Sequence, residues 1–237
     1  MKLQLYNIVT LLLLLMGLFS CTKNEDNRSI NIDNLSAQVK NASSFNSIAE
    51  VKLLIYDISA NRDTELAFGD WKNDGFTIVF PKILESKYLH TIIRGEWWWS
   101  LANSNYFAPS TVIDTMSTIS ISNKNIKITD ACFSGVNKDG LGITFFSLDN
   151  VGGISFRNES FTEAIFTYVD SDVTIYGYNR NRSDLTKEYS INWKRGWNVW
   201  YRSVSHMRRG ESIITKEQWT TTPVNGLKWY GNSSLSL

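Results

Sequence analysis

The feature that most constrains the fold is a series of short apolar runs, rich in β-branched and aromatic residues, at regular spacing in the second half of the chain. Turn-forming residues such as Asn137-Lys138-Asp139-Gly140 separate neighbouring runs, and no long helical repeat interrupts the series. The runs occupy residues 126–134, 141–148, 161–169, 173–178, 213–222 and 227–230. This spacing is typical of an antiparallel β-sandwich or barrel, so the sequence predicts an all-β fold.

The first half of the chain predicts fewer strands. Residues 51–58 form the first, and residues 66–71 and 76–80 form a hairpin around Asn73-Asp74-Gly75. We expect Gly75 to take the positive φ of that turn, because glycine adopts it without steric cost. Loops of two, three or four residues all fit, so the register stays open.

Residues 81–117 are the least regular segment, with a short helix expected near residues 83–89. We expect the chain to divide here into two packed β domains. Their predicted bounds are 48–116 for a sandwich-like domain and 117–237 for an antiparallel sandwich or barrel.

Three consecutive tryptophans, Trp97, Trp98 and Trp99, lie in this irregular segment. In an extended chain successive side chains point to opposite sides, so the three rings cannot all enter one core. One interpretation is that at least one ring reaches the surface and binds a ligand. The other is that the rings plug the open end of a β-sandwich.

Residues 189–201 predict a hairpin with a three-residue loop at Lys194-Arg195-Gly196. This loop places three apolar pairs opposite one another: Tyr189 with Tyr201, Ile191 with Val199, and Trp193 with Trp197. A two-residue loop would instead mix tryptophan with asparagine. The three-residue register is favoured because it gathers one clean apolar face.

Trp200 falls on the polar face of that hairpin, beside Asn198 and Arg202. An aromatic ring between amide and guanidinium groups is a candidate platform for stacking a sugar. The alternative is a second sheet or loop that covers this face. The following residues 203–210 contain His206 and two arginines and predict a solvated basic loop.

The N-terminus has the layout of a secretory signal peptide at residues 1–20. Lys2 precedes an apolar run at residues 8–19, which is shorter than the ~20 residues of a membrane-spanning helix. The run ends in Leu18-Phe19-Ser20-Cys21, which resembles the lipobox of bacterial lipoproteins. The resemblance implies cleavage before Cys21 and a lipid anchor on its thiol. The alternative is an ordinary signal peptide that happens to contain a cysteine.

Residues 21–47 are rich in Asn, Ser, Asp and Lys, and we expect a flexible tether with weak order near residues 30–35. The stretch Thr22-Lys23-Asn24-Glu25-Asp26-Asn27 resembles the signal that sends many Bacteroidetes lipoproteins to the cell surface, and Asp114-Thr115-Met116 resembles their glycosylation pattern. With the terminal Gly226-Leu227-Lys228-Trp229, these features resemble small surface lipoproteins of Bacteroidetes. The resemblance implies a β-sandwich body on the outside of the outer membrane and assigns no catalytic residue.

Charge and cysteine content exclude several classes of function. Cleavage of the leader would remove one of 24 basic residues and leave 23 beside 23 acidic ones. A near-neutral chain argues against a nucleic-acid partner and against binding an anionic bilayer by charge alone. Because lipidation uses Cys21, Cys132 has no disulfide partner, and we expect a small buried apolar residue there.

The sequence contains no glycine-rich phosphate loop and no Gly-x-Ser-x-Gly turn. His90 and His206 are far apart without a cysteine cluster, so we expect no zinc and no cofactor. Asp170 and Asp172 flank a turn, but two carboxylates fall short of the roughly six to eight oxygens of a calcium site. The acids left as candidates for a glycosidase pair are Glu96, Glu159, Glu163, Asp170 and Asp172.

These observations favour a lipid-anchored protein on the outer membrane surface that binds a glycan or a partner protein without catalysis. The candidate ligand-binding residues are Trp97, Trp98, Trp99, Trp200 and Arg202. A second hypothesis is a structural or accessory component of an envelope complex. A third is a lipid-anchored glycan hydrolase, which requires two facing acids or an acid beside a histidine.

Overall fold

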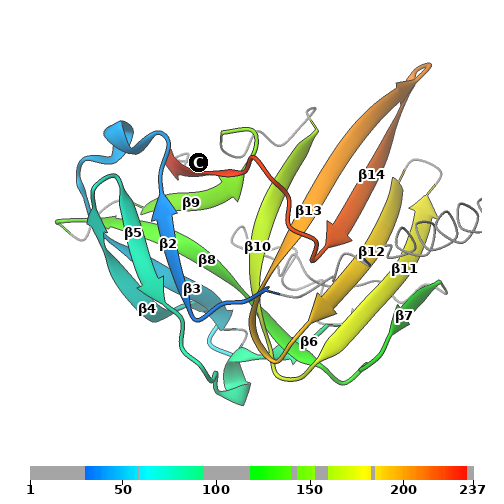
Figure 1. Ribbon diagram of the computed structural model, residues 1–237, viewed down its shortest axis with the longest axis horizontal. Helices are drawn as coiled ribbons and strands as arrows, with labels where there is room; N and C mark the ends of the chain where they lie inside the picture. Colours follow the sequence, from blue (N-terminus) through cyan, green and yellow to red (C-terminus); the bar gives the residue numbers. More distant parts are fainter. Residues whose placement is uncertain are drawn as a thin grey trace, which may run out of the picture.

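The computed structural model describes residues 30–57, 59–92, 118–139, 143–152, 160–182 and 185–233. These residues form fifteen strands joined in one hydrogen-bonded sheet, with two short 3-10 helices (Figure 1). The predicted all-β class is therefore confirmed. No helix in the described ranges is long and apolar enough to cross a bilayer. The leader, Cys21 and the three consecutive tryptophans lie outside the described residues.

Most strands coincide with the predicted apolar runs. The first eight are β1 (Ile30–Asn31), β2 (Asn34–Gln38), β3 (Ile48–Asp57), β4 (Arg62–Lys72), β5 (Gly75–Val79), β6 (His90–Thr91), β7 (Ile119–Ile121) and β8 (Lys127–Asn137). The others are β9 (Ile143–Asp149), β10 (Phe161–Val169), β11 (Val173–Arg182), β12 (Leu185–Trp193), β13 (Gly196–Arg209), β14 (Ser212–Thr220) and β15 (Lys228–Ser233). The 3-10 helices are η1 (Ala42–Phe45) and η2 (Ser86–Tyr88), the latter within the predicted helical stretch.

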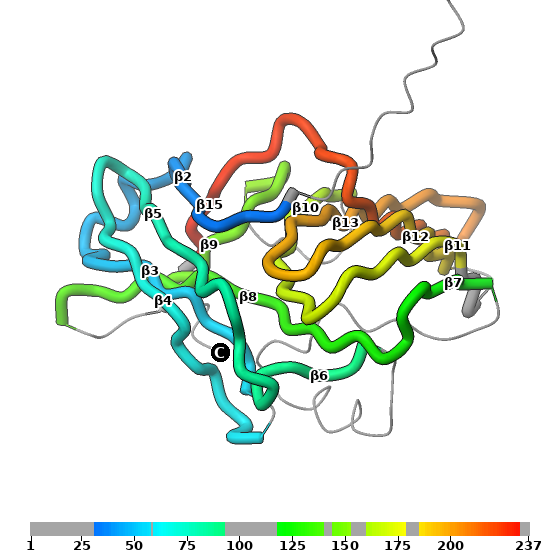
Figure 2. The backbone as a smooth tube through the Cα atoms, turned by 60° about the horizontal axis from the view of Figure 1, so that its bottom comes forward, coloured from blue at the N-terminus to red at the C-terminus, as the bar shows by residue number. Residues whose placement is uncertain are grey.

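The sheet runs in the order β2-β5-β4-β3-β8-β9-β10-β13-β14-β12-β11-β7, with β15 paired to β9. All of its strand pairs are antiparallel except the parallel pair of β12 and β14. The sheet curls over at one end, so that β2, β4 and β5 form a layer apart from β8, β9 and β10 (Figures 1 and 2). This arrangement is sandwich-like.

The first hydrophobic core fills the space inside that curl. Phe133 lies near its centre and makes edge-on contacts with Phe80, Phe166 and Trp229. Its members come from both sides of residue 116, and the pairing of β3 with β8 carries the sheet across that point. Residue 116 itself lies outside the described ranges, so the division into two domains stays a prediction.

A second core lies on the other face of the sheet, over the half that contains β11 to β14. Its largest side chains are Tyr189, Trp193, Trp200 and Trp219. Trp200 packs between Trp193 and Trp219, with ring centroids 6.1 and 4.9 Å away. The two cores use opposite faces because side chains alternate along each strand.

The predicted tether at residues 21–47 is shorter than expected. The weak order expected near residues 30–35 is present as β1 and the start of β2, but order continues through η1. Ala37, Val39 and Phe45 are buried in the first core, where sparse apolar residues at alternate positions are enough to seat an edge strand. The tether prediction is therefore wrong for residues 36–47.

The hairpin of β4 and β5 has a two-residue loop, because Lys72 pairs with Gly75. Asn73 and Asp74 take the positive φ values, 51° and 62°, so the expectation for Gly75 is wrong. Asn and Asp tolerate this conformation in tight hairpin turns. Gly75 is needed for a different reason, since a Cβ there would lie 2.1 Å from the Ala37 carbonyl oxygen of β2.

The predicted hairpin of residues 189–201 is also wrong. β12 and β13 do not pair, because β14 lies between them and bonds to both (Figure 1). Trp193 consequently enters the second core while Trp197 enters the first. The expected basic loop at 203–210 instead continues β13 to Arg209, which pairs with Ser212 across the tip.

Candidate functional site

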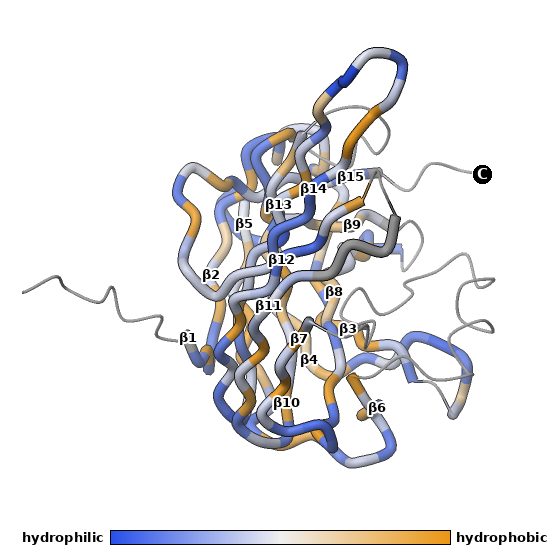
Figure 3. Tube along the Cα trace, turned by 90° about the vertical axis from the view of Figure 1, so that its right-hand side faces the viewer, coloured by the Kyte–Doolittle hydropathy of each residue, from blue (hydrophilic) through white to orange (hydrophobic). Residues whose placement is uncertain are grey.

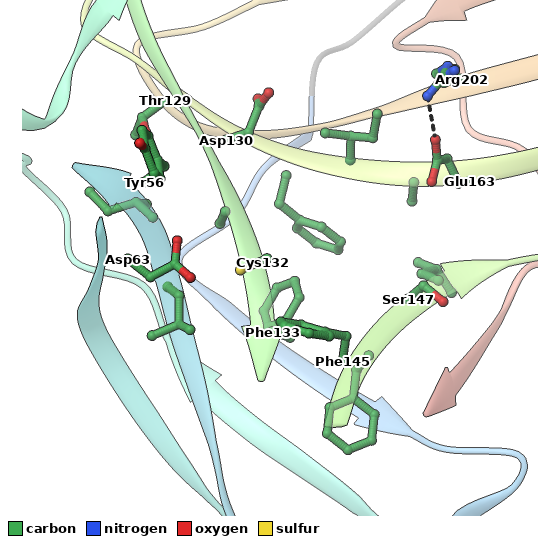
Figure 4. A pocket seen from close by; sticks show the side chains of 18 of the residues that line it. Tyr56, Asp63, Thr129, Asp130, Cys132, Phe133, Phe145, Ser147, Glu163 and Arg202 are labelled. Atoms are coloured by element: carbon green, nitrogen blue, oxygen red, sulfur yellow. Dashed lines mark hydrogen bonds and ion pairs between the residues drawn. The ribbon is translucent and has the colours of Figure 1, made fainter. Parts of the chain in front are cut away.

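A cavity of about 290 Å³ opens on the face of β8, β9 and β10 that lies opposite the first core. Figure 4 shows most of its lining side chains. The lining residues come from β3, β4, β6, β8, β9, β10, β13 and β15. Its walls combine apolar groups, including Leu54, Phe145 and Ile165, with three carboxylates, Asp63, Asp130 and Glu163. We treat this cavity as the candidate site.

Cys132 lies in the wall of the cavity and is a free thiol, half-buried rather than fully buried as expected. Burial raises the pKa of the Cys132 thiol, and the nearby Asp63 carboxylate adds to the effect. The thiol is therefore protonated at neutral pH and acts as a weakly polar wall group, not as a nucleophile.

Asp130 is held in place by a short chain of hydrogen bonds from the second core. The Trp200 indole Nε1 donates to Thr167 Oγ1 over 2.8 Å, and the Thr167 hydroxyl donates to Asp130 Oδ1. Thr167 and Asp130 are direct cross-strand partners on β10 and β8. The buried tryptophan therefore orients a cavity carboxylate.

This arrangement corrects the prediction for Trp200. Its ring is fully buried, so it offers no surface for stacking a sugar, and the alternative of a covered face is right. The pairing of β14 beside β13 brings Trp219 over the ring, which a local reading of residues 189–202 cannot anticipate. Trp97, Trp98 and Trp99 lie outside the described residues, so their predicted role stays a prediction.

Arg202 is the predicted candidate that does line the cavity. Its Nη1 donates to Glu163 Oε1 over 3.1 Å, and its Nη2 lies 3.6 Å from Glu217 Oε1. Lys187 lies 3.4 Å from the same Glu217 carboxylate. Burial raises the pKa of Glu163 even though the Arg202 guanidinium opposes the shift. Arg202 thus fixes Glu163 at one end of the cavity.

Asp63 and His90 line another part of the wall. Burial raises the pKa of Asp63, and no described residue forms a hydrogen bond or ion pair with its side chain. Burial lowers the pKa of His90 to about 4, so its imidazole is neutral at physiological pH. The cavity wall therefore carries more carboxylates than cations.

The three carboxylates are spread along the wall. Glu163 lies four residues from Thr167, the partner of Asp130, which is about 13 Å along β10 at ~3.3 Å per residue. Asp63 pairs with Tyr56 of β3, which places it two strands from β8, or about 10 Å. Glycosidase pairs lie about 5–9.5 Å apart, so the backbone spacing does not favour such a pair here.

The other predicted acids serve turns. Asp170 Oδ1 accepts a hydrogen bond from the Lys127 amide, and Asp172 accepts from the Lys194 ammonium and the Arg195 amide. The described ranges contain no group of three or more His, Cys, Asp or Glu side chains placed to share a metal ion. Glu96 and Glu159 lie outside the described residues.

Sequence reasoning missed Asp63, Asp130 and Phe145. One signal was present: Asp130 lies inside the predicted strand 126–134, where a carboxylate is costly unless it lines a wet site or is hydrogen-bonded. No such signal marked the others, because their strands meet only in the folded sheet.

No protein-family model matches the chain, and no curated protein and no solved structure is significantly similar to it. The resemblance to Bacteroidetes surface lipoproteins therefore stays a prediction.

Proposed function

We propose that the chain is a lipid-anchored binding module, exposed on the outer membrane surface, that holds an oligosaccharide in the cavity of β8, β9 and β10. The observation that carries the proposal is the cavity wall, where separated carboxylates alternate with apolar side chains. No catalytic step is part of the proposal.

The chemistry of a sugar suits this wall. A sugar ring has apolar C–H faces, which contact groups such as Leu54, Phe145 and Ile165, and hydroxyl edges that donate hydrogen bonds. Carboxylates accept such bonds more strongly than neutral acceptors do. Acceptors about 10 Å or more apart match hydroxyls on successive sugars better than one small ion. A cavity of about 290 Å³ lies just below the ~300–1,000 Å³ typical of ligand pockets, which suits a short oligosaccharide.

Pre-formed geometry supports the proposal further. Thr167 orients Asp130, and Arg202 holds Glu163 from the opposite side. Neither carboxylate has to be ordered when a ligand binds, and this lowers the entropic cost of association.

Isothermal titration calorimetry of the full chain in mild detergent, against a panel of neutral oligosaccharides, tests the cavity. We expect Asp130→Asn and Glu163→Gln each to weaken binding at least tenfold, since a lost charge-assisted hydrogen bond is worth ~1.5–3 kcal/mol. The matched control is Asp70→Asn, an exposed acid of β4 paired with Lys72 outside the cavity. Unchanged affinity in both cavity variants, or no binding of any sugar, rejects the cavity site.

The anchor has a separate test. Cells fed labelled palmitate should incorporate the label into the wild-type chain and not into Cys21→Ser. A labelled Cys21→Ser chain, or an unlabelled wild type, would show that the lipobox resemblance is misleading.

A further inference from the structure

Two tyrosines stand on the face of the sheet opposite the second core. Tyr176 and Tyr178 of β11 alternate with buried Ile175, and 68% and 56% of their surfaces are exposed. Figure 3 views the molecule from the side on which β7, β11 and β12 lie. This face is far from the cavity wall, whose residues belong to other strands or to the other face.

The two rings are held side by side on one strand. Residues two apart on a strand share a face at a spacing of about 7 Å. Within the described residues, neither ring makes a ring contact and neither hydroxyl makes a hydrogen bond. Both rings are therefore free to contact a ligand.

The backbone between the rings is fixed by the neighbouring edge strand. Gly177 has a φ of 133°, and a Cβ at this position would lie 2.2 Å from the Thr118 carbonyl oxygen. The Thr118 hydroxyl donates to the Tyr178 carbonyl oxygen, and β7 pairs with β11 through Ile119 and Gly177. Only glycine permits this close approach of β11 to β7.

Polar side chains surround the rings. Tyr176 lies opposite Ser120 and Ser190, and Tyr178 lies opposite Glu188. Glu188 accepts hydrogen bonds from Lys216, at 2.9 Å, and from Gln218, at 3.0 Å. The rings are thus isolated among hydrogen-bonding groups and do not form a contiguous apolar patch of the kind that docks a protein.

Charge narrows the ligand class. The Lys216 ammonium and the Gln218 amide hold the pKa of Glu188 below its usual range, so its carboxylate stays ionised beside Lys216. Among the side chains that the structure describes beside the two rings, one positive and one negative group lie in the same network and cancel. A neutral, hydroxyl-rich ligand fits this surface better than a nucleic acid or a charged polysaccharide.

We infer that Tyr176 and Tyr178, with Glu188 and Gln218 beside them, form an open platform that binds an extended neutral polysaccharide. The apolar faces of successive sugars stack on the two rings, while the carboxylate and amide take their hydroxyls. An open sheet face accepts a chain of any length, whereas the cavity accepts only a short piece. The platform is independent of the cavity.

Native affinity electrophoresis of the full chain in mild detergent, through gels that contain β-glucan, mannan or xylan, tests the platform. We expect at least one of these neutral polysaccharides to retard the wild type. The double variant Tyr176→Ala/Tyr178→Ala should be retarded less, with an apparent affinity at least tenfold lower than that of the wild type. The pair Tyr176→Phe/Tyr178→Phe should keep most of it, because the stacking face remains.

The matched control is Phe68→Ala, an aromatic ring 61% exposed on β4, which should leave retardation unchanged. Asp130→Asn, run in the same gels, separates the platform from the cavity and should also have no effect. Equal thermal midpoints establish that the variants fold. The inference is overturned if none of these neutral polysaccharides retards the wild type, or if the double alanine variant binds normally.

Discussion

His90 shows how one residue couples the candidate site to the stability of the whole chain. It lies on the short strand β6, pairs with Ile128 of β8 and is 8% exposed at the cavity wall. Its pKa of about 4 lies below the ordinary 6.5 because burial disfavours the imidazolium. The unfolded chain therefore binds a proton at a pH where the folded chain does not.

This difference predicts a loss of stability in acid. Between pH 6.5 and pH 4 the free energy of unfolding should fall by up to ~1.4 kcal/mol per pH unit, and above pH 6.5 His90 should contribute no pH dependence. Urea unfolding of the wild type and of His90→Gln at pH 7, 6 and 5 measures this loss. The free energy of unfolding of the variant should depend less on pH than that of the wild type.

Comparing the wild type with His90→Gln separates the contribution of His90 to the pH dependence from that of the cavity acids. Asp63 and Glu163 have raised pKa values, so their protonation favours the folded chain as the pH falls, in the wild type and the variant alike. His206→Gln, which replaces the only other histidine, is the control. A parallel profile for wild type and His90→Gln would refute the prediction.

Among the elements, the connection from β12 to β13 decides the topology of the second half. Asn198 is fully buried and organises this turn. Its Oδ1 accepts from the Lys194 amide, and its Nδ2 donates to the Lys194 and Gly196 carbonyl oxygens at 2.7 and 2.8 Å. These bonds hold the turn open, so that β12 and β13 separate and β14 enters between them.

Asn198→Ala should therefore cost about 2–4 kcal/mol in the free energy of unfolding, because three turn bonds vanish and buried backbone groups lose their partner. Equilibrium urea denaturation measures the change. Asn31→Ala is the control: this exposed side chain donates one bond to the Arg195 carbonyl oxygen at the same turn, and its loss should cost under ~1 kcal/mol. Equal costs for the two variants would show that Asn198 does not organise the turn.

For the molecule as a whole, the N-terminal residues close the first core. β2 pairs with β5, Val39 forms a parallel bridge with Trp229, and the Phe45 ring meets Phe146 edge-on at 6.2 Å. Segments nearly 200 residues apart in sequence thus complete one wall, as Figure 2 shows for β2 beside β15. Sheet closure of this kind depends on long-range contacts.

Removal of this closure should unfold the chain. A chain that begins at residue 30 retains every described strand, whereas one that begins at residue 48 loses Ala37, Val39, Ala42 and Phe45 from the core. Buried side chains of the larger kinds contribute ~1.5–3 kcal/mol each, so the loss approaches the ~5–15 kcal/mol that stabilises a typical domain. Circular dichroism and thermal melting should show a cooperative transition only for the longer chain. Similar melts would mean that residues 30–47 are a dispensable tether.

The positions of the strands were predictable from the sequence, but the pairing of the strands was not. The run at 161–169 coincides with β10, because alternating and β-branched residues mark a strand locally. The partner of a strand carries no such local mark. The pairs Tyr189–Tyr201 and Trp193–Trp197 looked compatible in isolation, but β14, which comes later in the chain, supplied better partners for both strands.

For the candidate site as well, local sequence showed which residues were unusual, but contacts with distant strands decided their roles. Arg202 was recognisable as a polar residue within an apolar hairpin, but its role depends on Glu163 and Glu217 from two other strands. The polar neighbours of Trp200 left open whether its face is exposed or covered, and the ring is buried because Trp193 and Trp219 pack on either side of it.

The amino-acid sequence alone determined the all-β class, the position of most strands and the near-neutral charge, since each depends on short-range patterns or on simple sums over the chain. Tertiary structure decided which strands pair, which tryptophans enter which core, and which carboxylates share a cavity. The physical reason is that a strand offers the same hydrogen-bonding edges to any partner. The choice among partners is made by burial of side chains that only meet when distant segments come together.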